Sequence, residues 1–398
     1  MSENRTDIAI VGGGLAGGLT ALALRILRPD VSVALVEAGD TLGGNHRWSW
    51  FASDLDPARG ALLEPFRTAR WDGNIVRFPR YERRLDADYL SLASRDFDAA
   101  LRQHLAQETI RTGSHVKAVE AGGVALDGGE RIGARAVIDM RGFSASRHLT
   151  GGWQVFMGRH LRTDRPHGVE RPVIMDATVE QLGGYRFVYV LPLGPDEIFV
   201  EDTYYQDEPV LDRAALSARL DSYCERSGWC GETLGSETGV LPVVTGGDRE
   251  AHLREIAVPG VALAGARALI AHPLTSYTLP LAAETALLVA RNADLAGPDM
   301  AELLAEHAQG VWDRTSHYRF LGHLLFDAAK PAERYRVFER FYTLPEGLIE
   351  RFYAARPTPT DKFRVLAGIP PVPLHRAFRA LARSGKSLDI PQQGIATG

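Results

Sequence analysis

The sequence predicts an α/β protein with a Rossmann-type dinucleotide-binding domain, an inserted and mostly antiparallel β-sheet domain, and a helical C-terminal region. Three observations predict it. A strand, a glycine-rich turn and a helix open the chain, short alternating strands follow Gly151, and proline-broken helical segments rich in Phe and Tyr follow Pro298. We expect these domains over 1–150 with 235–297, over 151–234 with part of 70–95, and over 298–398.

The segment from Asp7 to Glu37 has the pattern of a nucleotide-binding βαβ unit. Its apolar strand is followed by glycines at G-x-G-x-x-G spacing, which permit a tight turn, backbone approach to a pyrophosphate and close helix packing. The next helix directs free N–H groups at the phosphate, and Glu37 can accept hydrogen bonds from a ribose. A glycine turn without a nucleotide is the alternative. We expect dinucleotide binding by Gly12, Gly14, Leu15, Ala16, Gly17 and Glu37.

Composition and charge exclude several classes of protein. The 398 residues have a globular composition, and a net charge of −5 gives no general attraction to nucleic acid. The two cysteines, Cys224 and Cys230, form neither a disulfide framework nor a zinc motif, so no metal is expected. The N-terminus lacks a signal-peptide pattern, and no apolar run of about 18 residues predicts a membrane span. We expect a cytoplasmic protein.

The rest of the first domain favours FAD over NAD. After Glu37, Gly43 and Gly44 form a loop of the kind that contacts the pyrophosphate in many flavoproteins, so Gly44, Asn45 and His46 are assigned to the cofactor. Trp48, Trp50 and Phe51 either line the ligand or pack in the core. Ser94 is expected to cap a helix over 95–106, and a Gly-rich meander over 116–132 leads to a parallel strand that ends at Asp139. This order of strands is typical of an FAD domain, and Asp139 joins the cofactor residues.

After Gly151, strands are predicted over 153–157, 173–176, 185–191 and 197–205, and a helix over 211–227. Residues 235–243 are expected to return to the first domain, where a buried strand near 258–264 ends in a turn at Gly265. The passage from this turn to a helix over 281–291 can place backbone N–H groups at the pyrimidine edge of a reduced flavin, so Gly265, Thr275 and Tyr277 are assigned to the cofactor.

The C-terminal region is basic. From Lys330 to Lys386 there are 12 Lys or Arg and 5 Asp or Glu, so this block carries 12 − 5 = +7 and the remainder −12. This contrast favours contact with an anionic membrane surface, which predicts a peripheral location on the inner face of the cytoplasmic membrane.

Six blocks that occur in order over nearly the whole chain resemble the bacterial lycopene β-cyclases. They read GGNHRWSW at 43–50, PVIMDAT at 172–178, YRFVYVLPL at 185–193, VEDTYY at 200–205, GVLP at 239–242 and HPLTSYTLP at 272–280, and FYTLPE at 341–346 adds to them. Two positions differ from the expected pattern. The family more often has Gly where Ser276 stands, and Ala266 replaces the Asp of general FAD enzymes, which this family commonly lacks as well.

The resemblance implies conversion of the ψ end groups of lycopene to β-ionone rings, through γ-carotene to β-carotene. A proton adds to C2 and leaves a cation at C1, the C5=C6 bond closes the ring, and C6 loses a proton. The family uses reduced FAD, with NAD(P)H as the reductant, and no net redox change occurs. Lycopene or other ψ-end carotenoids are the implied substrates, and other carotenoid-pathway enzymes are the implied protein partners.

Glu201 is the first choice for the group that donates or accepts the proton. Alternate residues of a strand face opposite ways, so only one of Glu201 and Asp202 faces the pocket. A carboxyl group on an aromatic wall has a raised pKa, which suits an acid; the alternative is a solvated acid or one paired with Arg186. Asp202 and Glu237 are reserves. His272 contacts the flavin or substrate, or is a hydrogen-bonded structural residue.

Two other functions remain open on the residues alone. An FAD-dependent monooxygenase or polyprenyl reductase has the same nucleotide-binding pattern but consumes NAD(P)H with each product. A non-catalytic flavin-binding sensor is the third reading, and the acid in the strand motif argues against it.

Overall fold

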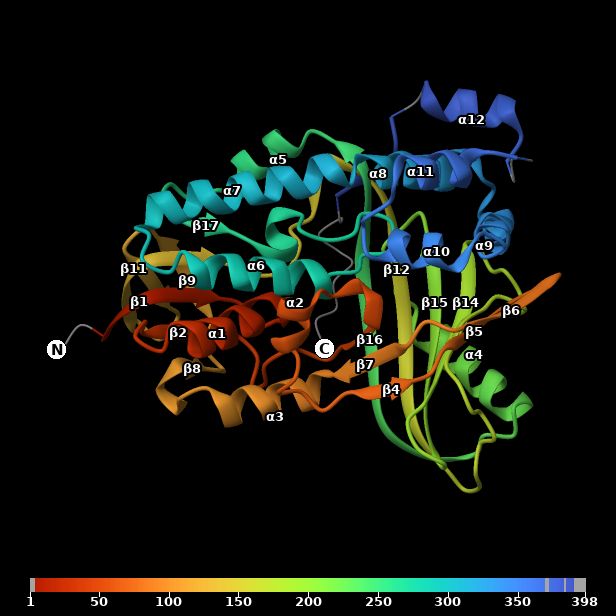
Figure 1. The fold of residues 1–398 in the computed structure, drawn as a ribbon, viewed down its shortest axis with the longest axis horizontal. Helices are drawn as coiled ribbons and strands as arrows, with labels where there is room; N and C mark the ends of the chain where they lie inside the picture. Colours follow the sequence, from red (N-terminus) through yellow and green to blue (C-terminus); the bar gives the residue numbers. More distant parts are fainter. Residues whose placement is uncertain (1–3, 369–371, 383, 390–398) are drawn as a thin grey trace.

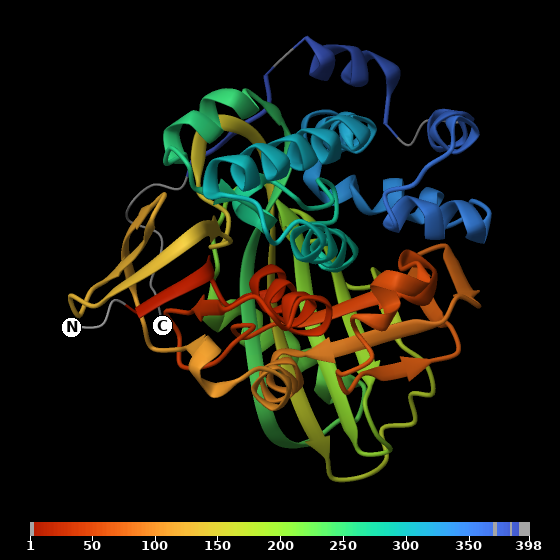
Figure 2. The same ribbon diagram turned by 60° about the vertical axis from the view of Figure 1, so that its left-hand side comes forward.

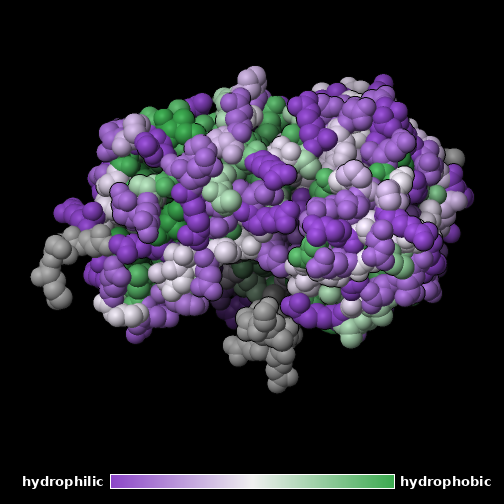
Figure 3. Space-filling model, turned by 90° about the horizontal axis from the view of Figure 1, so that it is seen from below, coloured by the Kyte–Doolittle hydropathy of each residue, from purple (hydrophilic) through white to green (hydrophobic). Residues whose placement is uncertain are grey.

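The structure is a computed structural model that describes residues 4–368, 372–382 and 384–389. Figure 1 shows two halves side by side, with the sheet of the N-terminal strands in one and a tall, twisted sheet in the other. Helices of the C-terminal region lie across the top of the second half. Seen from below in Figure 3, the surface is mostly hydrophilic, with a hollow between the two halves.

The first sheet has the strand order β8-β2-β1-β11-β10-β9. A seventh strand, β17, also pairs with β11. Strands β8, β2, β1, β11 and β17 are parallel, while β9 and β10 are antiparallel, as expected for the fold. The bounds are β1 Asn4–Val11, β2 Val33–Val36, β8 Ile110–Arg111, β9 Val116–Glu120, β10 Gly123–Leu126, β11 Arg131–Asp139 and β17 Ala262–Leu263.

The last strand of the meander and the returning parallel strand are one element, β11. Its first residues pair with β10, and the strand continues through Gly133 along β1 to Asp139. Helices α1 (Leu15–Leu27) and α6 (Leu279–Arg291) pack together, and their buried Leu and Ala residues share a core with Ile8 and Ile10 of β1. This apolar face arises from the helical spacing of the Leu and Ala residues.

Helix α3 spans Ser94–His104, so it begins one residue earlier than expected. Ala93 is its N-cap residue, and the prediction that Ser94 caps the helix is wrong. The Ser94 hydroxyl instead accepts a hydrogen bond from the backbone N–H of His46 at 3.3 Å. This bond links the start of α3 to the Gly43-Gly44 loop.

The second sheet has the order β16-β12-β15-β14-β13-β5-β6, with β18 beside β12. Residues 235–243, which were expected to return to the first domain, lie within β16 and pair with β12. The sequence pattern of 235–243 could not show this, because the partner strand β12 is distant along the chain. The bounds are β5 Asn74–Phe78, β6 Tyr81–Leu85, β12 Ser146–Thr163, β13 Val173–Asp176, β14 Tyr185–Pro192, β15 Glu197–Gln206, β16 Gly231–Gly247 and β18 Ser387–Leu388.

A small third sheet, β3-β7-β4, lies next to the tall sheet in Figure 1. Its strands are β3 Arg47–Phe51, β4 Ala69–Trp71 and β7 Tyr89–Ala93. Helix α4 (Arg213–Arg226) packs on β12 and β15, and the Asp212 side chain caps it by accepting a hydrogen bond from the N–H of Ala215 at 3.0 Å.

The C-terminal region is helical, as expected, and Figure 2 shows it above the sheets. Buried Arg334 joins it to the tall sheet, because its guanidinium donates to the Tyr205 carbonyl at 3.2 Å and to Asp207 at 2.5 Å. Among the helices of the described residues, none has the length and apolar character needed to cross a membrane. The remaining helices are α2 Pro57–Ala61, α5 Arg249–Ile256, α7 Gly297–Arg314, α8 Ser316–His323, α9 Tyr335–Phe341, α10 Glu346–Tyr353, α11 Pro359–Leu366 and α12 Leu374–Leu381.

Candidate active site

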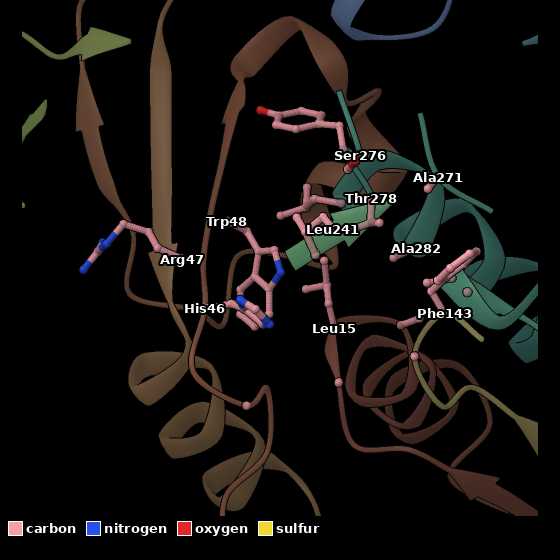
Figure 4. Close-up of a pocket in the computed structure, with 18 of the residues that line it drawn as sticks. Leu15, His46, Arg47, Trp48, Phe143, Leu241, Ala271, Ser276, Thr278 and Ala282 are labelled. Carbon is pink, nitrogen blue, oxygen red and sulfur yellow. The ribbon is translucent and has the colours of Figure 1, made fainter. Parts of the chain in front are cut away.

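A cavity of about 730 Å³ is lined by residues of all three sheets and of the loops between them. One end is formed by the glycine-rich turn after β1, and the other by aromatic and acidic side chains of β14, β15 and β16. Figure 4 shows part of its wall: His46 and Trp48 lie near Leu15, while Arg47 points away from Trp48. The cavity therefore joins the predicted cofactor residues to the predicted acid.

The glycine-rich turn leaves its backbone open to the cavity. Gly12 has φ of +105°, a conformation that favours glycine, and a Cβ at Gly14 would meet no atom within 4 Å. The carboxylate of Glu37 accepts hydrogen bonds from the N–H of Gly13 at 2.6 Å and of Gly39 at 2.8 Å. Gly12, Gly14 and Glu37 line the cavity, and so do seven more of the predicted cofactor residues: Leu15, Ala16, Gly44, His46, Gly265, Thr275 and Tyr277.

Gly17 is the supporting residue: it does not line the cavity, and a Cβ there would overlap the Gly12 carbonyl oxygen. Its role is close packing of α1 on the turn, which is one of the three roles expected of these glycines.

Two predicted cofactor residues, Asn45 and Asp139, lie outside the cavity lining and have partners within the protein. The Asn45 amide donates to the carbonyl of Ser236 at 2.8 Å, so it fastens the loop to β16 outside the cavity lining. The carboxylate of Asp139 is buried and forms ion pairs with Arg141 at 2.6 Å and Arg267 at 3.3 Å. Arg141, rather than Asp139, reaches the cavity.

Side chains of β12 and of the loop between η3 (Gly265–Ala268) and α6 have unpaired buried polar atoms at the cavity. Within the described residues, the buried Oγ1 of Thr275, Oη of Tyr277 and Oε1 of Gln154 have no hydrogen-bond partner, although all three residues line the cavity. Buried polar atoms in proteins are nearly always paired, so these atoms indicate a polar ligand. Together with the open backbone at Gly14, they fit a dinucleotide that carries a polar ring system.

His272 lies outside the lining of this cavity and forms hydrogen bonds with the backbone. Its Nδ1 accepts hydrogen bonds from the N–H groups of Leu274 and Thr275, and its Nε2 lies 3.2 Å from the carbonyl of Phe352. Complete burial lowers the pKa of His272 to about 4, which keeps the ring neutral. These contacts agree with the structural alternative for His272.

Four paired residues cross the tall sheet in one row: Tyr189, Glu201, Gly158 and Glu237 on β14, β15, β12 and β16. Paired residues of neighbouring strands point to the same face, so Glu201 and Glu237 lie on either side of a glycine that has no side chain. Both acids and Tyr189 line the cavity, and the two carboxyl groups share a hydrogen bond.

Burial dominates the electrostatics of this carboxyl pair. It raises the pKa of Glu201 and of Glu237, and proximity to Glu201 raises that of Glu237 further. The nearby Arg47 guanidinium opposes both shifts, and burial in turn lowers the pKa of Arg47. The Thr203 hydroxyl donates to Oε1 of Glu201 at 2.7 Å. The cavity therefore holds an acid in an apolar environment.

Asp202 faces the opposite side of the sheet, as the alternation of strand residues requires. Its carboxylate accepts hydrogen bonds from Nε of Arg186 at 2.8 Å and from the Tyr204 hydroxyl at 2.9 Å, and it is fully buried. The prediction that one of the two acids faces the pocket is confirmed. Asp202 forms a buried ion pair with Arg186, so Glu201 is the acid of the two that lines the cavity.

The sequence comparisons agree with this geometry. The family model described as "Lycopene cyclase protein" matches residues 7–379. The lycopene beta-cyclases of Pseudescherichia vulneris and of a Paracoccus species are each 43% identical to this chain, over 94% of it and 96% and 97% of their own lengths. The lycopene beta-cyclase of Pantoea ananas is 39% identical over 94% of the chain.

The chain belongs to the lycopene cyclase family.

Solved structures that resemble this lycopene cyclase have FAD-dependent folds. A geranylgeranyl bacteriochlorophyll reductase-like protein from Thermoplasma acidophilum has a TM-score of 0.59 at 15% identity, and the match covers 96% of this chain and 99% of that one. HpxO of Klebsiella pneumoniae, solved with FAD, has a TM-score of 0.57 at 14% identity, covering 93% and 100%. At these identities the likeness shows the fold alone, and it confirms the predicted fold class.

Several residues of the site in this lycopene cyclase were not predicted from the sequence. Arg47, Gln154 and Tyr189 line the cavity, and Gly158 separates the two acids. Tyr189 is two residues from Phe187, so both side chains point to the same face of β14. Alternation along this strand could therefore have identified Tyr189. Gly158 had no such signal, because its position depends on the pairing of three strands. Of the three aromatic residues left open, Trp48 and Phe51 line the cavity and Trp50 packs in the core.

Proposed function

We propose that this lycopene cyclase converts the ψ end groups of lycopene to β-ionone rings, through γ-carotene to β-carotene, with no net redox change. One observation carries the proposal: half-buried Glu201 and buried Glu237 face an aromatic cavity that is continuous with a dinucleotide-type glycine turn. The names of the relatives at 39–43% identity support the same activity.

The cofactor in this proposal is FAD in its reduced form, with NAD(P)H as the reductant. The turn at Gly12 and Gly14 would hold the pyrophosphate, Glu37 the ribose, and the loop at Thr275 and Tyr277 the ring system. Reduced flavin, when bound, supplies negative charge that stabilises a nearby cation. The open backbone and the unpaired polar atoms of the cavity support this assignment.

The residues of the chain supply the acid, the apolar walls and the exclusion of water. Glu201 exchanges a proton with the end group as donor or acceptor, and the raised pKa of the Glu201–Glu237 pair suits acid–base chemistry on an alkene. Aromatic faces stabilise positive charge through cation–π attraction, and walls without water prevent capture of the cation. The aromatic residues of the cavity wall on this side are Phe51, Tyr89, Phe156, Phe187, Tyr189, Phe199, Tyr205 and Tyr353.

Expression of the chain in cells that accumulate lycopene tests the activity. We expect carotenoids with β-rings, and we expect Glu201→Gln to abolish them while the purified variant keeps its bound flavin. A lack of β-rings with the wild-type chain contradicts the proposal. A monooxygenase or polyprenyl reductase would instead consume NAD(P)H in proportion to product, and a flavin sensor would form no product.

Peripheral contact with an anionic membrane surface, on the inner face of the cytoplasmic membrane, is part of the proposal. Phe363 and Phe378, on α11 and α12, are 72% and 70% exposed, and exposed Arg364 and Arg379 directly follow them in the chain. Exposed aromatic residues beside basic ones favour the interface of an anionic bilayer. Such a surface would bring the protein to a carotenoid dissolved in the membrane and to other carotenoid-pathway enzymes.

A further inference from the structure

The register of the tall sheet brings two carboxyl groups together where ordinary strand pairing would separate them. Glu201 and Glu237 both pair with Gly158, from opposite sides of β12. Neighbouring strands lie about 4.8 Å apart, so two Glu side chains can meet above a residue that has no side chain. Two carboxyl groups share a hydrogen bond only when one of them carries a proton.

We propose that Glu201 and Glu237 act as one acid–base unit that holds a single proton, and that in the resting protein this proton is on Glu237. What the unit does in catalysis rests on the proposed cyclase function. The location of the proton does not, since it follows from the contacts of the protein.

The contacts of the two carboxyl groups differ in a way that locates the proton. The Thr203 hydroxyl donates to Oε1 of Glu201 at 2.7 Å, and a donated hydrogen bond stabilises the carboxylate form. Within the described residues, no hydroxyl or amide group donates to Glu237, whose hydrogen bond is the one it shares with Glu201. Glu237 is therefore the better site for the proton, and it donates to the Glu201 carboxylate.

The groups around the unit limit it to one proton. Arg47 of β3 favours ionisation of both acids, which opposes a second proton. Tyr189 pairs with Glu201 across β14 and β15, and burial raises its pKa, so it stays neutral. Asp202 is on the far face, where Arg186 compensates its charge, and its residual effect raises the pKa of Glu201. Burial raises the pKa of both groups and so opposes loss of the remaining proton.

A pair of carboxyl groups that holds one proton matches the proton balance of the cyclisation. Glu237 gives its proton to C2, the C5=C6 bond attacks C1, and the Glu201 carboxylate removes the proton from C6. In the new ring C2 and C6 are both bonded to C1, so two neighbouring carboxyl groups can serve them. The substrate gains one proton and loses one, and the proton on Glu201 then returns to Glu237 along their hydrogen bond.

Infrared spectroscopy of the purified full-length protein tests the location of the proton. A protonated carboxyl group has a carbonyl stretch distinct from those of a carboxylate. We compare the wild-type chain, Glu201→Gln and Glu237→Gln at neutral pH in the absence of carotenoid. Glu232→Gln is the control, because Glu232 is an exposed residue of the same strand β16. Circular dichroism verifies the fold of each variant.

Asp54, whose pKa burial raises to about 7, adds a band that is common to all variants, so each variant is compared with the wild type in a difference spectrum. We expect no lost band in Glu232→Gln and Glu201→Gln, and the loss of one protonated carboxyl band in Glu237→Gln. Adding Thr203→Val to Glu237→Gln removes the hydroxyl donor with little change of shape, so Glu201 takes up a proton and the band returns. β-Ring formation should be lost in both Gln variants of the pair and retained in Glu232→Gln.

Three outcomes would overturn the proposal: no such band in the wild type, its loss only in Glu201→Gln, or its persistence in Glu237→Gln. If either Gln variant fails to fold, Thr203→Val in the otherwise wild-type chain tests the proposal. Loss of the hydroxyl donor to Glu201 must then shift the carbonyl band of the wild type. The failure of the two proposals is distinguishable. A wild-type chain that makes no β-rings but shows the expected infrared pattern contradicts the cyclase function and supports the proton assignment.

Discussion

Ser276 occupies a backbone conformation that favours glycine, with φ of 56°. Its hydroxyl donates to the carbonyl of Pro242 at 2.7 Å, which ties the cavity loop to β16. The resemblance to lycopene cyclases indicated that Gly is more usual at this position. The positive φ supplies the physical reason, and the hydrogen bond explains how a serine is accommodated.

Two substitutions of Ser276 separate strain from hydrogen bonding. Ser276→Ala keeps the strained conformation and loses the hydrogen bond, so we expect a loss of about 1 kcal/mol in the free energy of unfolding. Ser276→Gly also loses the bond but relieves the strain, which is worth about 1 kcal/mol. Ser276→Gly should therefore be the more stable variant in denaturant unfolding. Equal stabilities would show that the backbone of Ser276 is not strained.

The buried ring of His272 makes stability depend on pH. Its pKa is about 4 in the folded chain against 6.5 for an unperturbed ring, so the unfolded state binds more protons between these values. The contribution of neutral His272 to the free energy of unfolding is thus fully present above about pH 6.5. It decreases by up to about 3 kcal/mol as the pH drops through 4. Unfolding midpoints of the wild type and of His272→Asn, measured from pH 7 to 4, should differ in slope.

The control for this measurement is His104→Asn, since His104 is exposed at the end of α3. It should leave the pH dependence unchanged. If His272→Asn has the same slope as the wild type, protonation of His272 does not limit acid stability. The raised pKa values of Asp54 and of the Glu201–Glu237 pair act in the opposite direction, and they cancel in the comparison between variants.

At the scale of elements, the site depends on how β15, β12 and β16 align. A Cβ on Gly158 would lie 2.9 Å from Cε2 of Phe199 and 3.0 Å from Cγ of Glu237, which is closer than packed atoms allow. Gly239, two residues after Glu237, likewise makes room for the ring of Phe156. Small residues on the central strands thus let large side chains fill the face that lines the cavity.

We expect Gly158→Ala to lower β-ring formation by at least tenfold, because the new methyl group displaces Phe199 and separates the two acids. Gly235→Ala is the matched control, since Gly235 is on β16 and a Cβ there meets no atom within 4 Å. Product formation in lycopene-accumulating cells, compared at equal protein level, checks both variants. Full activity in Gly158→Ala would contradict the close approach of the two carboxyl groups.

The sequence predicted those elements whose signal is local. The Gly12–Gly17 turn with a helix directly after it was expected, and strands β13 to β15 were expected within a few residues of their observed bounds, because glycine spacing and side-chain alternation mark them. Alternation also predicted that only one of Glu201 and Asp202 faces the pocket.

What the sequence could not predict depends on non-local pairing or on partners distant along the chain. The row across Gly158 needs the register of four strands, and the extent of β12 and β16 follows from their mutual pairing. Asp139 has the sequence context of a cofactor ligand, but its partner Arg267 is far away along the chain. His272 required the carbonyl of Phe352 before its structural role could be recognised.

At the scale of the whole molecule, helices α11 and α12 expose Phe363 and Phe378, and each is followed by an exposed arginine. We predict salt-sensitive binding of the purified chain to liposomes that contain anionic lipid. Phe363→Ser together with Phe378→Ser should weaken this binding about tenfold or more, since each ring contributes about 1.5–3 kcal/mol when buried. Val210→Ser is the control, because Val210 is 63% exposed and precedes α4. Liposome sedimentation over a range of salt concentrations measures the effect.

Binding that is absent, or that does not weaken with salt, contradicts the proposed membrane surface. Equal effects of Val210→Ser and of the double Phe substitution would show instead that any exposed apolar residue contributes.

The domain boundaries remain a prediction, and the sheet pairing of 231–247 indicates that the second unit includes this strand.

The glycine turn and the aromatic walls enclose the same volume, so a ligand at one end would form part of the surface that a second ligand contacts. The proposed function then predicts that the binding of flavin and of carotenoid is thermodynamically linked. Linkage is reciprocal: if flavin tightens carotenoid binding by some factor, carotenoid tightens flavin binding by the same factor. Heating should therefore release flavin fluorescence at a higher temperature when lycopene is present. An unchanged release temperature would show that the two ends bind independently.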